Sequence, residues 1–267
     1  MIVAYYQGDT ALHRLNPLAK LSAVLAGCTA VFLFGNVALV LGSLAGVIAV
    51  AYASDAGRVM DVMRSRFAVM LGLWLIAINA LFTPAGRVLV TVPFYFFYLS
   101  ITDAGLIMGV LYAARFLTVF LISALFVAST EPAALVYALM RRGLPYRYGF
   151  LLVLMLRFVP VFERERKMVS DAQKMRGLEI DKRGVRSMYR SLRYTVVPLI
   201  VSALQKTESL VMSMEGRAFG YRPDRTFTFE DHFGARDLVV TAVSWAVFAL
   251  ALVGRFSGWR LLNGATF

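Results

Sequence analysis

Long uncharged, mostly apolar runs separated by charged segments dominate the pattern along the chain. Residues 21–54 form the first of these runs and contain no charged side chain. As one helix they would extend about 51 Å, far more than the ~30 Å hydrocarbon core of a bilayer. Gly35 and Asn36 lie in the middle of the run and indicate a turn. The pattern therefore predicts a helical hairpin over residues 18–34 and 37–53.

Three later runs have the same character. They cover residues 67–82, 104–130 and 238–254, and only the second contains a charged residue, Arg115. Together with the hairpin they predict about five transmembrane helices. The segment 84–103 differs, because it is rich in aromatic and β-branched residues and its apolar part is too short to cross a bilayer as a helix. We expect an interfacial hairpin or a short re-entrant piece there.

Composition narrows the class of protein. Hydrophobic residues make up 59% of the 267 residues and charged residues only 16%, whereas soluble domains carry about 25% charged residues. A soluble globular enzyme and a disordered chain are both excluded, and the predicted fold class is an all-α membrane protein. One cysteine and two histidines leave no disulfide framework or Cys/His metal site. No catalytic or P-loop motif occurs either, so we expect no enzyme activity, cofactor or metal.

The positive charge is unevenly distributed. The net charge is +12, and 24 of the 28 Lys and Arg residues lie in segments 1–20, 54–66 and 131–237. Positively charged loops face the cytoplasm, so this bias predicts a cytoplasmic N-terminus, with 131–237 at the cytoplasmic face. Topology thus explains the charge, and no motif points to nucleic acid. We expect membrane helices over 1–130, a cytoplasmic coupling region over 131–237, and a last membrane helix within 238–267.

Residues 131–237 are predicted to contain two long helices at the membrane surface. The apolar stretches 148–156 and 194–205 are too short to cross a bilayer. Each continues into a charged stretch with apolar residues at helical spacing, which is typical of a helix that emerges at the membrane surface.

Both of these helices are expected to end in an arginine beside small residues. The two ends are Met175-Arg176-Gly177 and Gly216-Arg217-Ala218. A cation at a helix C-terminus complements the helix dipole, and Gly177 or Gly220 can adopt a left-handed cap. Small neighbours also leave the guanidinium accessible to a partner's carboxylate. Ordinary helix capping is the alternative interpretation of both motifs.

Several stretches of the chain together resemble a known family. They are residues 8–20, the sequence Leu156-Arg157-Phe158-Val159-Pro160 followed by Glu163 and Glu165, and the two helix ends. The family they resemble is the transmembrane coupling (T) component of energy-coupling-factor (ECF) importers, the EcfT/CbiQ family, and the resemblance covers nearly the whole chain. That family writes the helix ends as Ala-Arg-Gly. Both arginines match, whereas Met175 replaces the first alanine, and glycine and alanine are exchanged in the second motif.

The resemblance implies an adaptor subunit in a prokaryotic plasma membrane. Such subunits connect two cytoplasmic ABC-type ATPase subunits to a separate membrane protein, the S subunit, which binds a vitamin or a metal such as cobalt. The partners hydrolyse ATP, and the adaptor transmits their movement within the lipid bilayer. The resemblance assigns ATPase docking to Met175, Arg176, Gly177, Gly216, Arg217 and Ala218. It is consistent with a coupling or structural role for Arg115, Arg157, Pro160 and Glu163.

Other functions compete with the adaptor. A self-contained secondary transporter or channel would need acidic residues within the spans and an inverted repeat, and we find neither. A membrane-bound enzyme would need clustered His, Asp or Glu residues. Arg115 either contacts the coupling helices or pairs with a helix-end carbonyl. Arg157 either contributes to coupling or extends its charge toward the headgroups.

Overall fold

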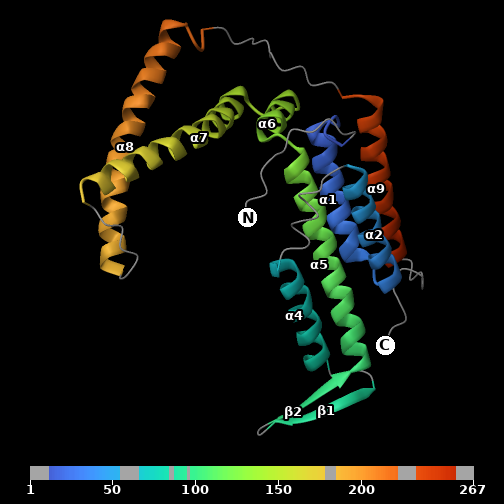
Figure 1. Cartoon of the computed structure of the whole chain (residues 1–267). Coiled ribbons are helices and arrows are strands. Elements are labelled where there is room, and N and C mark those ends of the chain that lie inside the picture. The colour runs from blue at the N-terminus through green and yellow to red at the C-terminus, as the bar shows by residue number, and fades with distance from the viewer. Residues whose placement is uncertain are drawn as a thin grey trace. The chain divides into compact units, whose positions relative to one another are not determined.

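The computed structural model describes residues 12–54, 66–83, 87–94, 97–177, 185–221 and 233–256. The chain divides into two compact units: unit 1 comprises Met1–Ala138 and Asp231–Phe267, and unit 2 comprises Leu139–Glu230. Helices make up most of the described residues in each unit (Figure 1). The predicted class, an all-α membrane protein, is confirmed.

The helices of unit 1 coincide with the predicted apolar runs. They are α1 (Pro17–Leu33), α2 (Val37–Ala53), α4 (Arg66–Phe82), α5 (Asp103–Ser129) and α9 (Ala235–Phe256), and α6 (Pro132–Arg141) leads into unit 2. Helices α5 and α9 are long and apolar enough to cross a bilayer, and α1, α2 and α4 are shorter apolar helices. How many helices cross the membrane, and in which direction, stays a prediction.

The predicted turn between α1 and α2 is set by asparagine caps. Asn36 precedes α2 and its Oδ1 accepts the Ala38 N–H at 2.9 Å. Asn16 does the same for α1, accepting the Leu18 N–H at 2.9 Å, with a proline at the first helical position. Asparagine side chains satisfy N–H groups that have no partner inside the helix. These caps explain why the long uncharged run breaks into two helices.

Helix α5 is the central element of unit 1. It packs against α1, α2 and α4 and buries eleven of its residues. A Cβ at Gly105 would lie 2.7 Å from the Asn79 carbonyl oxygen, and one at Gly109 would lie 2.8 Å from Ile76 Cα. The two glycines, four residues apart, therefore let α5 approach the backbone of α4 closely, as small residues do in membrane helices.

A β-hairpin connects α4 to α5. Strands β1 (Val88–Phe94) and β2 (Phe97–Thr102) pair antiparallel, at the end of α4 and α5 (Figure 1). The Thr102 hydroxyl donates to the Thr83 carbonyl at 2.8 Å and accepts the Gly105 N–H at 3.1 Å, so it caps α5 and ties the hairpin to α4. The predicted hairpin at 84–103 is thus present, and its depth in the membrane stays a prediction.

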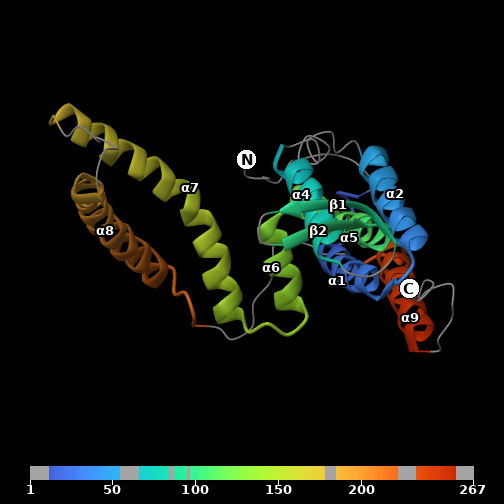
Figure 2. The same ribbon diagram turned by 90° about the horizontal axis from the view of Figure 1, so that it is seen from below.

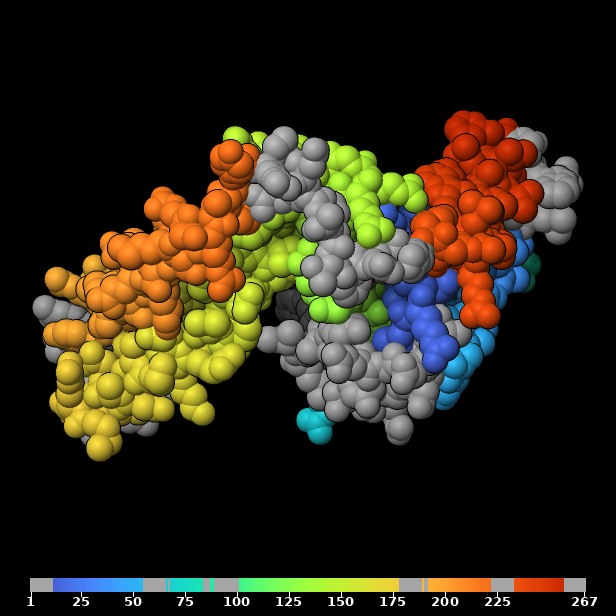
Figure 3. All heavy atoms as spheres, turned by 90° about the horizontal axis from the view of Figure 1, so that it is seen from above, coloured from blue at the N-terminus to red at the C-terminus, as the bar shows by residue number. Residues whose placement is uncertain are grey.

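Unit 2 is built on two long helices. Helix α7 (Tyr146–Met175) has 30 residues and α8 (Val185–Gly216) has 32. They run in roughly opposite directions and cross each other (Figure 1 and Figure 2), and their atoms lie against each other in the space-filling view (Figure 3). Gly149 is buried against Met140 at the end of α6, where a Cβ would overlap the Met140 side chain. The predicted pair of long helices is present.

Candidate functional site

Arg176 occupies the C-cap position of α7. Its N–H donates to the Gln173 carbonyl at 3.1 Å, and the Gly177 N–H donates to the Lys174 carbonyl at 3.0 Å. Gly177 has a φ of +80°, the left-handed conformation that glycine adopts at the residue after a helix C-cap. The expected left-handed cap at Gly177 is therefore observed.

Arg217 occupies the same position in α8, but the residue after it is not glycine. The Phe219 N–H donates to the Met214 carbonyl at 3.0 Å, and the Ala218 N–H donates to the Glu215 carbonyl at 2.9 Å, the two bonds of a Schellman cap. Ala218 has a φ of +51°. The sequence pointed to Gly220 for this role, and Gly220 does have a positive φ of +96°. The cap itself is nevertheless formed by Ala218, at a steric cost of about 1–2 kcal/mol.

Both arginine side chains are accessible. Arg176 and Arg217 are exposed, and so are their neighbours Gly177, Gly216 and Ala218. Met175 is 90% exposed, so the residue that departs most from the family motif projects into solvent. Among the described residues, no carboxylate pairs with either guanidinium. The two ends thus present one free cation each on similar backbone caps.

A third helix ends in the same way. Helix α6 ends at Arg141, Arg142 is its C-cap, and Gly143 follows with a φ of +112°. The Leu144 N–H donates to the Leu139 carbonyl at 3.1 Å, which completes another Schellman cap. This Arg-Gly pair was not predicted from the sequence, although the same dipeptide marks the end of α7.

A polar link joins the middles of α7 and α8. The Ser202 hydroxyl donates to Glu165 Oε1 at 2.6 Å, and the Lys206 ammonium forms an ion pair with Glu165 Oε2. Hydrogen bonds from Lys206 and Ser202 lower the pKa of Glu165 below its ordinary value. Glu163, the residue named from the sequence, is exposed. The described contacts therefore make Glu165, not Glu163, the acidic residue between the two helices.

An aromatic cluster joins the end of α8 to the start of α7. The Phe219 ring lies 4.7 Å from the Phe150 ring and 6.3 Å from the Tyr146 ring, between ring centroids. Phe219 is the second residue after the α8 C-cap, and Tyr146 is the first residue of α7. The tip of α8 that carries Arg217 therefore packs on the start of α7.

Each long helix contains an internal proline. Pro160 lies in the middle of α7 and Pro198 in the middle of α8, where proline removes one backbone hydrogen bond and bends a helix. Arg157 lies one turn before Pro160, and both residues are exposed. Pro160 was predicted from the sequence to have a role, whereas Pro198, which occupies the corresponding place in α8, was not. The coupling roles of Arg157 and Pro160 stay predictions.

Arg115 lies in unit 1, on α5. Its guanidinium donates to the Phe34 carbonyl at the end of α1 and lies 5.5 Å from the Tyr112 ring centroid. A helix-end carbonyl lacks a partner within its own helix, and Arg115 supplies one. This geometry corresponds to the structural alternative for Arg115, and the alternative contact with the coupling helices stays a prediction.

The fold and the site together define a membrane protein that has a helical bundle and two long helices, each of which ends in an exposed arginine. A family described as cobalt transport protein, CbiQ, matches residues 8–228, and the chain belongs to this family.

Several relatives resemble the chain over nearly its full length. It is 26% identical over 254 residues to the energy-coupling factor transporter transmembrane protein EcfT of Acidaminococcus fermentans, covering 92% of this chain and 93% of the relative. It is 27% identical over 270 residues to the EcfT protein of Bacillus selenitireducens, covering 97% and 98%. A putative ABC transporter ATP-binding protein of Bifidobacterium longum is 28% identical over 240 residues, which cover 86% of this chain and 30% of that protein.

Proposed function

We propose that this protein is the membrane-embedded adaptor of an ATP-driven ECF-type importer. Unit 1 lies in the plasma membrane of a prokaryotic cell, and α7 and α8 dock on two cytoplasmic ABC-type ATPase subunits. A separate S subunit binds the vitamin or transition metal that is imported. The ATPase subunits hydrolyse ATP, and α7 and α8 transmit their movement to the S subunit. The names of the relatives support this role.

The observation that carries the proposal is the pair of equivalent helix tips. Arg176 and Arg217 are both exposed C-cap residues, each followed by a residue in the left-handed conformation. A helix C-terminus is a negative dipole end, so an arginine there presents a cation at the tip of a rigid rod. A carboxylate in a groove on each ATPase would accept two parallel hydrogen bonds from the guanidinium.

The apolar surface of unit 2 supports a role in assembly. Helix α7 buries only Gly149 among its 30 residues, while large apolar side chains of both helices are exposed. Examples are Leu151, Met155, Val159, Ile200 and Leu204. Many exposed large apolar side chains on a few helices are typical of contacts with protein or membrane. We assign this surface to the S subunit and to the bilayer, and the arginine tips to the ATPases.

The ATP-binding relative supports an ATPase partner. Its similarity to this chain is confined to 30% of its own length, so the segment that resembles this adaptor is part of a longer chain that is named for ATP binding. A fused arrangement keeps the adaptor and the ATP-binding function together permanently. In the protein described here, we propose that the same association is formed between separate subunits.

The proposed topology places the N-terminus and residues 131–237 on the cytoplasmic side. The Lys20 ammonium donates to the Ser129 carbonyl at 2.7 Å, and the Asn16 N–H donates to Asp237 Oδ1 at 2.7 Å. The start of α1, the end of α5 and the start of α9 therefore lie at one end of unit 1. This arrangement supports a shared membrane face for the N-terminal segment and residues 131–237.

The experiment that tests this function is co-purification of ABC-type ATPase subunits with the tagged full-length chain from its native membrane. Two ATPase subunits per adaptor are expected. Removing one partner of a buried charge pair typically costs about 2–5 kcal/mol, so Arg176→Ala or Arg217→Ala should lower the recovered ATPase by tenfold or more. The double variant should recover none, and lysine should restore only part, because it lacks the planar fork.

Arg193→Ala is the matched control, because Arg193 is an exposed arginine of α8 away from its tip. It should recover as much ATPase as the native chain. Equal losses from Arg193→Ala and Arg217→Ala would mean that bulk positive charge, rather than the helix tips, binds the partners. Normal recovery with the double variant would make both arginines plain helix caps.

A further inference from the structure

A cluster of buried polar groups lies at one end of unit 1, and the function proposed above gives it no role. We call it the polar junction, and it consists of Asn16, Lys20, Ser129 and Asp237. Each of these residues is at most 6% exposed. They come from the segment before α1 and from the ends of α1, α5 and α9. Buried charges are costly unless they are paired or hydrogen-bonded, so such a cluster calls for a reason.

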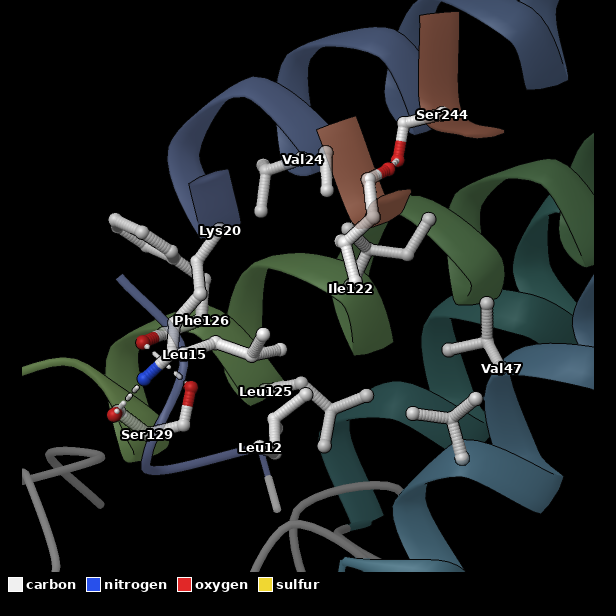
Figure 4. A pocket seen from close by; sticks show the side chains of 13 residues that line it. Leu12, Leu15, Lys20, Val24, Val47, Ile122, Leu125, Phe126, Ser129 and Ser244 are labelled. Atoms are coloured by element: carbon white, nitrogen blue, oxygen red, sulfur yellow. Dashed lines mark hydrogen bonds between the residues drawn. The ribbon is translucent and has the colours of Figure 1, made fainter. Parts of the chain in front are cut away.

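Lys20 joins α1 to the end of α5. Its ammonium donates to the Ser129 carbonyl at 2.7 Å and to the His13 carbonyl at 3.3 Å. Ser129 is the last residue of α5, so its carbonyl has no partner within that helix. Figure 4 shows this contact at one end of a mostly apolar cavity of about 320 Å³ between α1, α2, α5 and α9. A cation at this helix end also complements the α5 dipole.

Asp237 joins α9 to the start of α1. One of its oxygens accepts the Asn16 N–H at 2.7 Å, and the other accepts the Gly234 N–H at 2.8 Å. Asn16 in turn caps α1 through its side chain. The first turns of α1 and α9 and the last turn of α5 are therefore tied together by charged or cap-forming groups.

The polar junction lies where the chain passes between the units. Helix α5 ends at Ser129 and leads through α6 into unit 2, which begins at Leu139. The chain returns to unit 1 at Asp231, and α9 begins at Ala235. Both covalent connections therefore pass within about ten residues of the junction. A displacement of α7 and α8 would therefore reach unit 1 through the end of α5 or the start of α9.

We infer that Lys20 and Asp237 are positioning residues of energy coupling, which anchor both connections to α1 so that a displacement of unit 2 moves α1, α5 and α9 together. This inference rests on the proposed function. Without the anchor, the end of α5 and the start of α9 would yield separately, and the movement of the ATPases would be absorbed at the junction instead of reaching the bundle.

The test uses the purified complex of the full chain with its ATPase subunits. In a Cys28→Ala background, spin labels replace Leu25 on α1 and Val127 on α5, which are both well exposed. We expect one narrow distance distribution with and without a non-hydrolysable ATP analogue in the native chain and in Lys20→Arg. In Lys20→Met the distance distribution without nucleotide should match that of the native chain. When the analogue is added, it should broaden or split by several ångströms.

A second variant tests the other half of the junction independently of Lys20. Asp237→Asn keeps the size of the side chain but loses one acceptor, and labels at Leu25 and Val243 report on α1 and α9. The same nucleotide-dependent broadening is expected. Arg14→Met, which removes an exposed cation from the segment that contains Asn16, is the control and should behave as the native chain.

Three outcomes would overturn the inference. A narrow distribution with nucleotide in both junction variants would show that the anchor does not transmit movement. A broad distribution already present without nucleotide would mean that the junction only stabilises the fold. Failure of ATPase subunits to co-purify with the native chain would instead reject the proposed function, and with it this inference.

Discussion

The two units of this protein bury their side chains to very different extents. In unit 1, α5 buries eleven of its 27 residues, and Leu121 at its centre is fully buried. In unit 2, α7 buries one of 30 residues, and no described side chain of α8 is buried. The central helix of unit 1 and the two long helices of unit 2 therefore have opposite environments within one chain.

The contacts that hold the helices together also differ between the two units. Glycines bring α5 against the α4 backbone in unit 1, whereas α7 and α8 are joined by the Glu165 link and by the aromatic cluster around Phe219. Close backbone packing resists separation, while a few side-chain contacts leave most of a helix surface available. The comparison teaches that unit 1 has a core of its own around α5, whereas unit 2 leaves most of its helix surface free of contacts within the unit.

The largest expected effect concerns the packing of unit 1. Gly109→Val places a branched side chain against the α4 backbone at Ile76, and overpacking at backbone is expected to cost about 3 kcal/mol or more. Denaturant unfolding of the chain in detergent measures this loss. Gly42→Val is the matched control, because a Cβ at Gly42 meets nothing within 4 Å. Similar losses from both variants would show that α4 and α5 do not depend on close approach.

A smaller effect separates the two units directly. Leu121→Ala, at a fully buried position of α5, should lower the free energy of unfolding by about 2–4 kcal/mol. Leu204→Ala, at a 61% exposed position of α8, should change it by less than about 0.5 kcal/mol. In the assembled complex Leu204→Ala should have the larger effect of the two, because it should reduce the recovery of partner subunits. If Leu204→Ala destabilised the isolated chain as much, unit 2 would have a core of its own.

The helix caps of unit 2 offer a matched pair of substitutions. Ala218→Gly relieves a left-handed alanine and should stabilise the last turn of α8 by about 1 kcal/mol, while Gly177→Ala should destabilise the corresponding turn of α7 by a similar amount. Hydrogen exchange at the amides that form the two caps, Ala218 and Gly177, measures both effects. No gain in protection for Ala218→Gly would mean that the cap conformation is not populated in solution.

The smallest effect concerns the link between α7 and α8. Hydrogen bonds from Lys206 and Ser202 lower the pKa of Glu165, so the link is complete above the ordinary glutamate range near 4.3 and is lost as pH falls through the lowered value. Spin labels at Met168 and Val201, both exposed, should give one narrow distance at pH 7 that broadens only after the pH has fallen below the ordinary range of glutamate pKa values.

The matched variants for this link are Glu165→Gln and Glu163→Gln. The first should broaden the distance between α7 and α8 at neutral pH, and the second should leave it unchanged, because Glu163 is exposed. An equal change from Glu163→Gln would assign the contact to general charge on α7 instead of to the Glu165 link.

Much of the local structure was predictable from the sequence. Long uncharged runs gave the helices of unit 1, and the aromatic and β-branched segment at 84–103 gave a hairpin, because hydrophobic length and backbone propensity act over neighbouring residues. The arginine tips of α7 and α8 also followed from local signals, since a cation and a small residue mark a helix end. The arginine at the end of α6, Arg142, and the internal proline of α8, Pro198, were equally visible in the sequence. Neither was recognised there.

Tertiary structure alone decided which of these residues meet. Glu163 and Glu165 are two residues apart on one helix, so they lie on different faces, and only the packing of α8 selects Glu165. Lys20 meets Ser129 across 109 residues and Asn16 meets Asp237 across 221, and no local pattern marks those partners. The sequence by itself therefore determined the apolar helices of unit 1, the arginine ends of α7 and α8 and the class of protein, but not the helix α6 or the start of α8 at Val185. Burial of charge at the polar junction was decided by packing, because a charged group becomes buried only where distant segments supply its hydrogen-bond partners.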